Sequence, residues 1–245
     1  MSTSTEVHKT VKRGDRFPAT LLRQGSVGRL RSSLLDRLKP LHRRMRDQKI
    51  DLFLRHVGDC RKQASLLDVG GSPGIDGEFR RLHSSFAEVV IVNLHEHAFT
   101  SNDTAIKFVR ADGCALPFRA NSFDWVFSNA VIEHVGDATR QRRFAGEIRR
   151  VAARGYFVAT PNKYFPIEPH TLLPFYQFLP LSVQRRLARF SPGYMTDPLE
   201  INLLSCTEMQ LLFPGAQVSK IGLPLLPSSL LALFKASPQD DYELS

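Results

Sequence analysis

Residues 67–74 read Leu-Asp-Val-Gly-Gly-Ser-Pro-Gly, and they decide the fold expected for the rest of the chain. A short apolar run leads into them, which predicts a buried β-strand followed by a tight turn. Gly70, Ser72 and Gly74 stand at every second position, and Asp68 precedes the first of them by two. Glycines let a backbone approach a ligand closely, and a following helix offers free N–H groups. The turn therefore predicts a ligand site, without the G-x-G-x-x-G spacing of a dinucleotide-phosphate site.

Strand and helix patterns alternate along the chain around this turn. Short apolar runs predict strands, and a periodicity of 3.6 residues predicts helices. Strands are expected at 64–70, 88–93, 106–112, 123–129 and 155–160, and helices at 78–84 and 137–153. This alternation predicts an α/β fold with a parallel sheet and helices on both of its faces.

The character of the sequence changes after residue 160. Residues 161–204 combine aromatic side chains with seven prolines. That composition is too apolar for a linker and too rich in proline for one long helix, so it predicts a packed lid. Ser205-Cys-Thr-Glu208 has the spacing of a capping box that opens a helix to about residue 213. Two last strands are expected at 217–223 and 229–235.

Most of the net charge of +9 lies at the start of the chain, where residues 1–60 hold 14 Lys and Arg against six Asp and Glu. Apolar residues recur there at helical spacing over 32–57, and Pro40 predicts either two helices or one kinked helix. A basic leader suits contact with nucleic acid, anionic lipid or a phosphorylated substrate. A solvated helix face with a frayed tail is the alternative interpretation.

Composition excludes several classes of protein. Charged residues make up 23% of the chain, which excludes wholesale disorder. The uncharged stretch 221–234 is too short to span a bilayer, and residues 1–20 lack the apolar core of a secretory signal. Cys60, Cys114 and Cys206 are too few and too far apart for a disulfide framework or a zinc site. We therefore expect a reducing, cytoplasmic location, with peripheral membrane contact through the basic leader as a further option.

A second stretch adds a family resemblance. It reads Arg110-Ala-Asp-Gly-Cys-Ala-Leu-Pro-Phe118 and then Asn121-Ser-Phe-Asp-Trp-Val-Phe-Ser-Asn-Ala-Val-Ile-Glu-His134. Together with the alternating glycines, it resembles class I S-adenosylmethionine-dependent methyltransferases of the type-11 group. The resemblance is close over residues 64–162 and loose over residues 203–236. The resemblance implies a Rossmann-like, doubly wound sheet of seven strands in a three-layer α/β/α domain, with the last strand antiparallel. The implied organisation is a basic tail and helical cap at 1–60, then a methyltransferase domain at 61–245 with a lid insertion at 161–204.

The resemblance also implies a cofactor, S-adenosyl-L-methionine, and the residues that bind it. In the family an acid at the end of the second strand binds the ribose, and this chain has Asn93 there. Restoring the acid is therefore expected to tighten cofactor binding. Asp112 corresponds to the acid that bonds the adenine amine, and Gly113 lines the same pocket. The full set of expected cofactor-binding residues is Asp68, Gly70, Gly71, Ser72, Gly74, Asn93, Asp112, Gly113 and Asn129.

His134 and His170 are the candidate catalytic residues. An imidazole titrates near neutral pH and can take a proton from an acceptor. His134 follows the fourth predicted strand, and His170 lies in the predicted lid. The alternative for His134 is that its pair with Glu133 caps a local helix and packs the site. Methyl transfer from a sulfonium is an in-line displacement that requires no metal ion, so none is expected.

The expected function is methyl transfer to a small-molecule or lipid-like acceptor. The centre of the lid, residues 171–184, carries no charged side chain, which suits a pocket wall that contacts an apolar acceptor. Two alternatives stay open. One is an RNA or protein methyltransferase, which the basic leader alone supports, and the other is a non-catalytic binding module that keeps the fold. The sequence does not indicate an oligomeric state.

Overall fold

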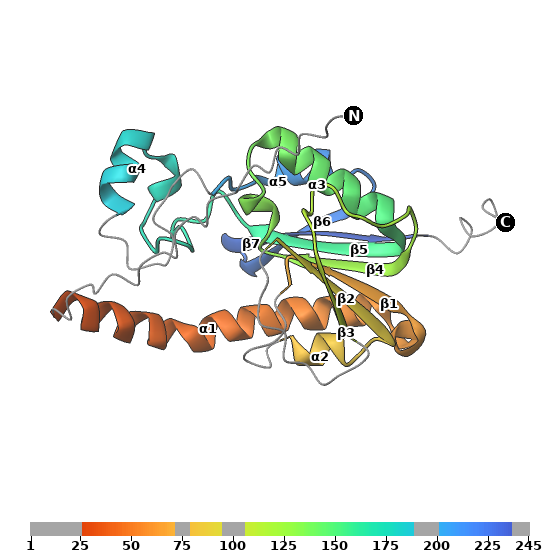
Figure 1. Cartoon of the computed structure of the whole chain (residues 1–245). Coiled ribbons are helices and arrows are strands. Elements are labelled where there is room, and N and C mark those ends of the chain that lie inside the picture. The colour runs from red at the N-terminus through yellow and green to blue at the C-terminus, as the bar shows by residue number, and fades with distance from the viewer. Residues whose placement is uncertain (1–25, 72–78, 95–105, 189–200, 237–245) are drawn as a thin grey trace, which may run out of the picture.

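The computed structural model of the chain describes residues 26–71, 79–94, 106–188 and 201–236. Its centre is one sheet of seven strands (Figure 1). The strands are β1 (Ser65–Val69), β2 (Glu88–Asn93), β3 (Ile106–Arg110), β4 (Phe123–Asn129), β5 (Ala152–Pro161), β6 (Gln217–Leu223) and β7 (Leu226–Lys235). Across the sheet they lie in the order β3-β2-β1-β4-β5-β7-β6.

The directions of the strands confirm the predicted topology. β1 pairs parallel with β2 and β4, and the parallel pairing continues to β3 on one side and to β5 on the other. β7 pairs antiparallel with both β5 and β6. The last strand of the chain is therefore the antiparallel one, and it lies between the two strands that precede it.

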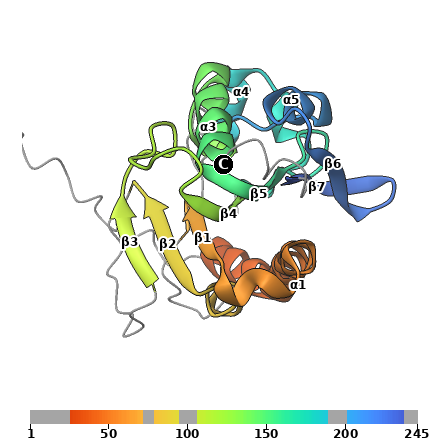
Figure 2. The same cartoon turned by 90° about the vertical axis from the view of Figure 1, so that its right-hand side faces the viewer.

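Helices cover both faces of the sheet, as Figure 2 shows. One face carries α1 (Ser26–Val57) and α2 (Arg80–His83), and the other carries α3 (Ala138–Val151) and α5 (Cys206–Leu212). Side chains of a strand point alternately to the two faces. In β1, for example, Leu66 belongs to the core under α1, and Leu67 belongs to the core under α3.

The amino-terminal helix is a single helix of 32 residues with Pro40 inside it, so the interpretation as two separate helices is wrong. Its carboxyl-terminal end supplies three buried side chains to the sheet, namely Ile50, Phe53 and Val57. The packing of this end holds the helix against the strands. Among the described residues, no helix is long and apolar enough to cross a membrane.

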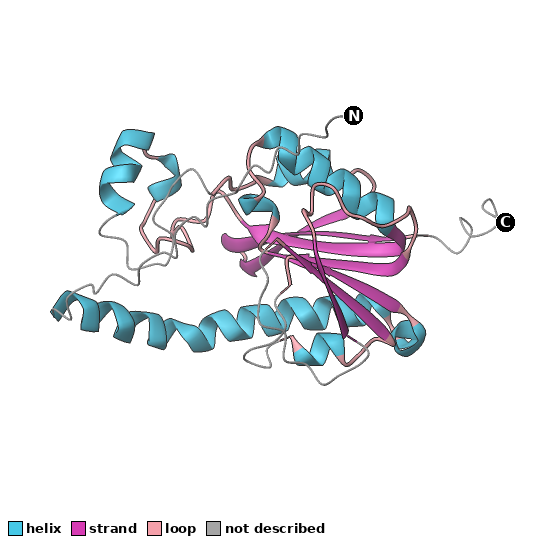
Figure 3. Ribbon diagram, viewed as in Figure 1, coloured by secondary structure: helices cyan, strands magenta, loops and turns pink. Residues whose placement is uncertain are grey.

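Most elements lie where the sequence predicted them (Figure 3). β2, β4 and β6 begin and end at the expected residues. The capping box of α5 is confirmed, because the Ser205 hydroxyl accepts from the Glu208 backbone N–H and the Glu208 carboxylate accepts from the Ser205 backbone N–H. Residues 72–78, after β1, lie outside the described residues, and the helix predicted at 78–84 is described only as the short α2.

After β5 the chain leaves the sheet as the segment that the sequence predicted to be a lid. Its described part holds a 3-10 turn (Tyr176–Phe178) and α4 (Leu181–Ala188), while 189–200 lie outside the described residues. The Gln177 side-chain amide braces the segment, because it donates to the carbonyls of Lys163 and Phe165 at 3.0 and 2.7 Å. In Figure 1 the segment and the amino-terminal half of α1 extend past the same end of the sheet.

Phe53 offers a test of how much α1 contributes to stability. Its ring is fully buried and lies 5.2–6.1 Å, between ring centroids, from Phe86, Trp125, Phe127 and Phe157. Phe53→Ala should lower the free energy of unfolding by about 3–5 kcal/mol in a urea titration, because it leaves a cavity among large side chains. Leu211→Ala, at a side chain that is 76% exposed, is the control and should change it little. Equal stability of the two variants would contradict the packing.

Candidate functional site

A pocket of about 330 Å³ lies at the carboxyl ends of the central parallel strands. It falls beside the junction of β1 and β4, where the strand order reverses, which is where open α/β sheets bind ligands. Four loops line it, one after each of β1, β2, β3 and β4, and α3 closes it. The lining residues are Val69, Gly70, Val92, Asn93, Leu94, Ala111, Asp112, Gly113, Ala130, Val131, His134, Val135, Arg140 and Phe144.

The glycines after β1 are required by their surroundings. Gly70 has a φ of +82°, and an added Cβ would collide with the side chain of Val131. At Gly71 an added Cβ would collide with the carboxylate of Asp68. That carboxylate is buried, and its Oδ2 lies 2.8 Å from His83 Nε2. Asp68 therefore packs beneath the glycine turn and is not among the residues that line the pocket.

Asn93 both lines the pocket and holds the glycine turn. Its side-chain amide donates to the carbonyls of Gly70 and Gly71, at 3.3 and 3.0 Å. A carboxylate has no N–H to donate and would face two carbonyl oxygens there. The expectation that an acid at position 93 would strengthen the site is therefore revised, because the amide has a bracing role that the sequence pattern did not show.

Asp112 and Gly113 lie together in the pocket, as the sequence predicted. One Asp112 oxygen accepts from Arg140 Nη2 at 2.7 Å, and the other accepts from the Cys114 backbone N–H at 2.9 Å. Partial burial acts to raise the pKa of Asp112, but the hydrogen bonds from Arg140 and Cys114 together with the charge of Arg140 outweigh it, so the pKa lies below its usual value. An added Cβ on Gly113 would come within 2.7 Å of the Phe144 ring, so only glycine fits at this position of the pocket without moving that ring.

Of the remaining predicted cofactor residues, Asn129 is described and is not among those that line the pocket. Ser72 and Gly74 fall outside the described residues. Asn129, at the end of β4, accepts a hydrogen bond of 3.2 Å from Lys49 Nζ of α1. Lys49 is buried, and desolvation lowers its pKa to about 8, against the opposing charge of Glu133. The sequence did not indicate this lysine, because in α1 it is one basic residue among many.

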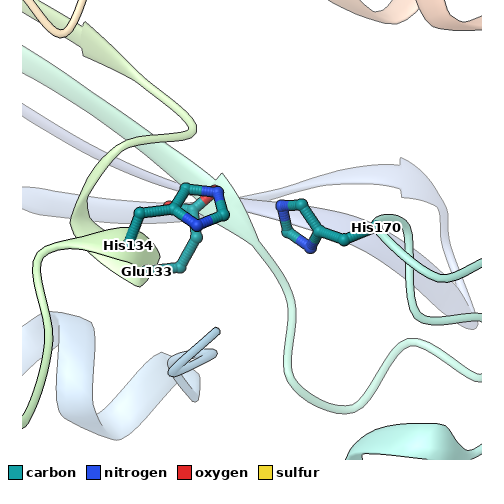
Figure 4. A group of neighbouring side chains, drawn as sticks. All are labelled: Glu133, His134 and His170. Atoms are coloured by element: carbon teal, nitrogen blue, oxygen red, sulfur yellow. The ribbon is translucent and has the colours of Figure 1, made fainter. Parts of the chain in front are cut away.

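The two candidate catalytic histidines meet, although 36 positions separate them in the chain. The rings of His134 and His170 lie edge to face with their centroids 4.7 Å apart, and Figure 4 shows them facing each other beside Glu133. One ligand atom from each of these three residues lies within 4.8 Å of the others. His134 also lines the pocket, so the predicted lid reaches the pocket's edge through His170.

Two buried carboxylates take part here, Glu133 as a member of the group and Glu168 as the hydrogen-bond partner of His170. Glu168 accepts from His170 Nδ1 at 2.6 Å, and it also accepts from the backbone N–H groups of His170 and Thr171. Burial acts to raise the pKa of Glu168, but the hydrogen bonds and charge of His170 and the Thr171 bond outweigh it, so the pKa is lowered. Glu133 is fully buried, and one of its oxygens accepts from the Thr160 hydroxyl at 3.0 Å.

Glu168 also lines a second pocket, of about 290 Å³, between the lid and α3. The other lining residues are Ala138, Gln141, Lys163, Tyr176, Gln177, Gln184, Ile201, Asn202, Leu203 and Glu208. His134 borders the first pocket, and Glu168, which holds His170, borders the second. His134 and His170 therefore lie between the first pocket and the second.

Comparison with known proteins agrees with this geometry. A family model described as a methyltransferase domain matches residues 67–159, which begin within β1 and end within β5. Residues 67–159 are thus similar to the methyltransferase domain family. The recognition made from the glycine turn and the Arg110–His134 stretch is thereby confirmed.

The relatives share this domain and only part of their length. An uncharacterized methyltransferase of Mycolicibacterium vanbaalenii is 34% identical over 108 residues, which cover 43% of this chain and 41% of that protein. Phosphoethanolamine N-methyltransferase 2 of Caenorhabditis elegans is 28% identical over 101 residues, 36% of this chain and 22% of that protein. The crystal structure of an S-adenosylmethionine-dependent methyltransferase from Mesorhizobium loti has the same fold, with a TM-score of 0.54 at 16% identity over 76% of this chain and 95% of that one.

Asn93→Asp tests the bracing role of the amide. At neutral pH we expect the free energy of unfolding to fall by about 1–3 kcal/mol, because two carbonyls lose their donor beside a carboxylate. Asn93→Ala is the control that removes the same hydrogen bonds without adding a charge, and it should cost less. Thermal or urea unfolding of the two variants measures the difference. An Asp variant as stable as the wild type would contradict this role.

The ionisation of Glu168 should appear in the pH dependence of stability. Because its pKa in the folded protein lies below the usual 4.5, its contribution is present above that value and is lost as the pH falls further. Glu168→Gln should therefore lose less stability than the wild type between neutral pH and the acid range. Urea titrations at several pH values measure both slopes. Parallel curves would show that this carboxylate is not held in its charged form.

Proposed function

We propose that this protein transfers a methyl group from S-adenosyl-L-methionine to a small-molecule or lipid-like acceptor. One observation carries the proposal, namely that the predicted cofactor residues Gly70, Asn93, Asp112 and Gly113 line one pocket at the point where the strand order reverses. The family match over the same part of the chain supports it.

We assign each part of the cofactor a partner in the pocket as part of this proposal. In this proposal the adenine lies by Asp112 and Gly113, and the ribose lies near Asn93 and the glycine turn. The methionine part then extends along the carboxyl end of β4, towards His134. Such an arrangement serves methyl transfer because the protein mainly has to align the acceptor atom with the sulfonium methyl.

The lid is the proposed acceptor side. His134 and His170, which lie between the two pockets, are the proposed acceptor contacts. Glu168, the partner of His170, lines the second pocket. The lid also exposes several large apolar side chains, which suits an apolar or lipid-like acceptor better than a nucleic acid. They are Tyr164, Ile167, Phe175, Phe178, Leu181 and Val183.

Calorimetric titration with S-adenosyl-L-methionine tests the cofactor half of the proposal. The wild type should bind one cofactor per chain. Asp112→Ala should weaken binding by about 10- to 100-fold, which is the value of a hydrogen bond to a charged group. Asp59→Ala, at an exposed carboxylate far from the pocket, is the control and should bind like the wild type. A wild-type protein that shows no binding would overturn the proposal.

His170→Ala tests the acceptor half. Turnover measured as labelled-methyl transfer with cell extracts should fall by about 10²-fold, because the acceptor loses a positioning contact. The affinity for S-adenosyl-L-methionine should stay the same, since His170 does not line the cofactor pocket. His56→Ala is the control histidine, because its ring lies against Trp125 and the end of β7. Full activity of His170→Ala would remove it from the acceptor site.

The same preparations separate the proposal from a non-catalytic binding module. Cofactor binding with no labelled product from any extract fraction would favour the module. Binding together with a labelled small molecule or lipid supports the enzyme. A label found only in RNA or protein would redirect the acceptor to a macromolecule.

A further inference from the structure

Within the described part of the chain, only one oxygen of the buried Glu133 carboxylate accepts a hydrogen bond. Thr160 donates to Oε2, and Oε1 has no hydrogen-bond partner among the described residues, although the residue is fully buried. The nearby ammonium of Lys49 donates to Asn129 and not to this carboxylate. A buried, unpaired carboxylate oxygen costs free energy, so a native structure that retains one calls for an explanation.

Two imidazoles approach the same place. Nε2 of His134 lies 4.0 Å from Glu133 Oε1, and His170 faces His134 from the lid (Figure 4). The ligand atoms of the three residues lie within 4.8 Å of one another. An atom at their centre would lie at most about 2.8 Å from each, so each ligand would have to close by about 0.7 Å to reach the usual ~2.1 Å of a zinc bond. The side chain of His134 is 30% exposed and has room to make that movement.

Glu168 prepares His170 for this role. An ionised carboxylate only accepts hydrogen bonds, so the 2.6 Å contact requires the His170 Nδ1 to carry the proton. The other ring nitrogen, Nε2, then carries the lone pair. Metal-bound histidines in proteins are held by this same kind of carboxylate contact, which fixes the tautomer and makes the imidazole a better ligand.

We propose that Glu133, His134 and His170 bind a divalent transition-metal ion of the Zn²⁺ type. Two imidazoles and one carboxylate suit such an ion and leave coordination positions open for another molecule. The net charge of the site favours it, because Glu133 and Glu168 are both buried acids in contact with these histidines. Lys49 is a cation that interacts with Glu133, and its charge opposes the ion.

The use of the ion rests on the proposed function. His134 also lines the cofactor pocket, so the open positions would face the acceptor beside the methyl group. A hydroxyl acceptor bound there would lose its proton to water more readily. Its oxygen would then form a bond to the methyl carbon while the sulfur–methyl bond breaks, leaving S-adenosylhomocysteine as a neutral thioether. The inference therefore points to an oxygen nucleophile.

Titration of untagged, chelator-treated protein with Zn²⁺ and Co²⁺ tests the site. Calorimetry should show one ion per chain, and bound Co²⁺ should give visible absorption bands. His134→Asn, His170→Asn and Glu133→Gln should each abolish this binding. Glu168→Gln should weaken it by about 10- to 100-fold, as expected for a residue that orients a ligand. His56→Gln, at a histidine near the opposite end of β4, is the matched control and should bind like the wild type.

The wild type failing to bind either ion in a saturable way would overturn the inference. So would binding that the His134→Asn variant keeps, and this variant changes a partly exposed side chain and should fold. S-adenosyl-L-methionine binding to the same metal-free protein separates the two proposals. Cofactor binding without ion binding overturns the metal site alone, whereas ion binding without cofactor binding overturns the proposed function and retains the site.

Discussion

The parallel pairing of β1 with β2 on one side and β4 on the other is the constraint on which the site depends. Because successive crossovers run away from β1 in opposite directions, the loops after β1 and β4 separate and leave a crevice at their carboxyl ends. The register matches Leu67 to Val90 and to Val126, so all three strands end at nearly the same level. The pocket residues on the strands and on the loops that follow them reach their places from that common edge, and α3 adds Arg140 and Phe144.

The sequence predicted this edge well because the signals there are local. Glycines after an apolar run, and a short strand followed by Asp112, each describe a structure of fewer than ten residues. Asn93 shows the limit of such signals. Its place at the end of β2 was predicted from the sequence. The role of its amide depends on where the carbonyls of Gly70 and Gly71 point, and the fold sets the direction of those carbonyls.

The group formed by Glu133, His134 and His170 could not be predicted from the sequence. His134 and His170 were each recognised as candidates, but their contact is set by the path of the chain after β5. Metal-ligand patterns in sequences are short, fixed spacings, and an adjacent pair with a third residue 36 positions away is not one of them. The role of Glu168 could not be predicted either, because its carboxylate accepts hydrogen bonds from backbone N–H groups of the loop that carries His170. Those contacts depend on the conformation of the loop.

The position of Lys49 has a consequence for the modular organisation of the chain. The family match begins at residue 67, yet the helix before it supplies Phe53 to the core under the sheet and Lys49 to the end of β4. A protein cut at the start of the matched segment would expose an apolar sheet face and lose the amine that holds Asn129. We therefore expect the recognisable domain to need the preceding helix in order to fold stably in this chain. Any exchange of domains with a relative would have to carry the preceding helix along with it.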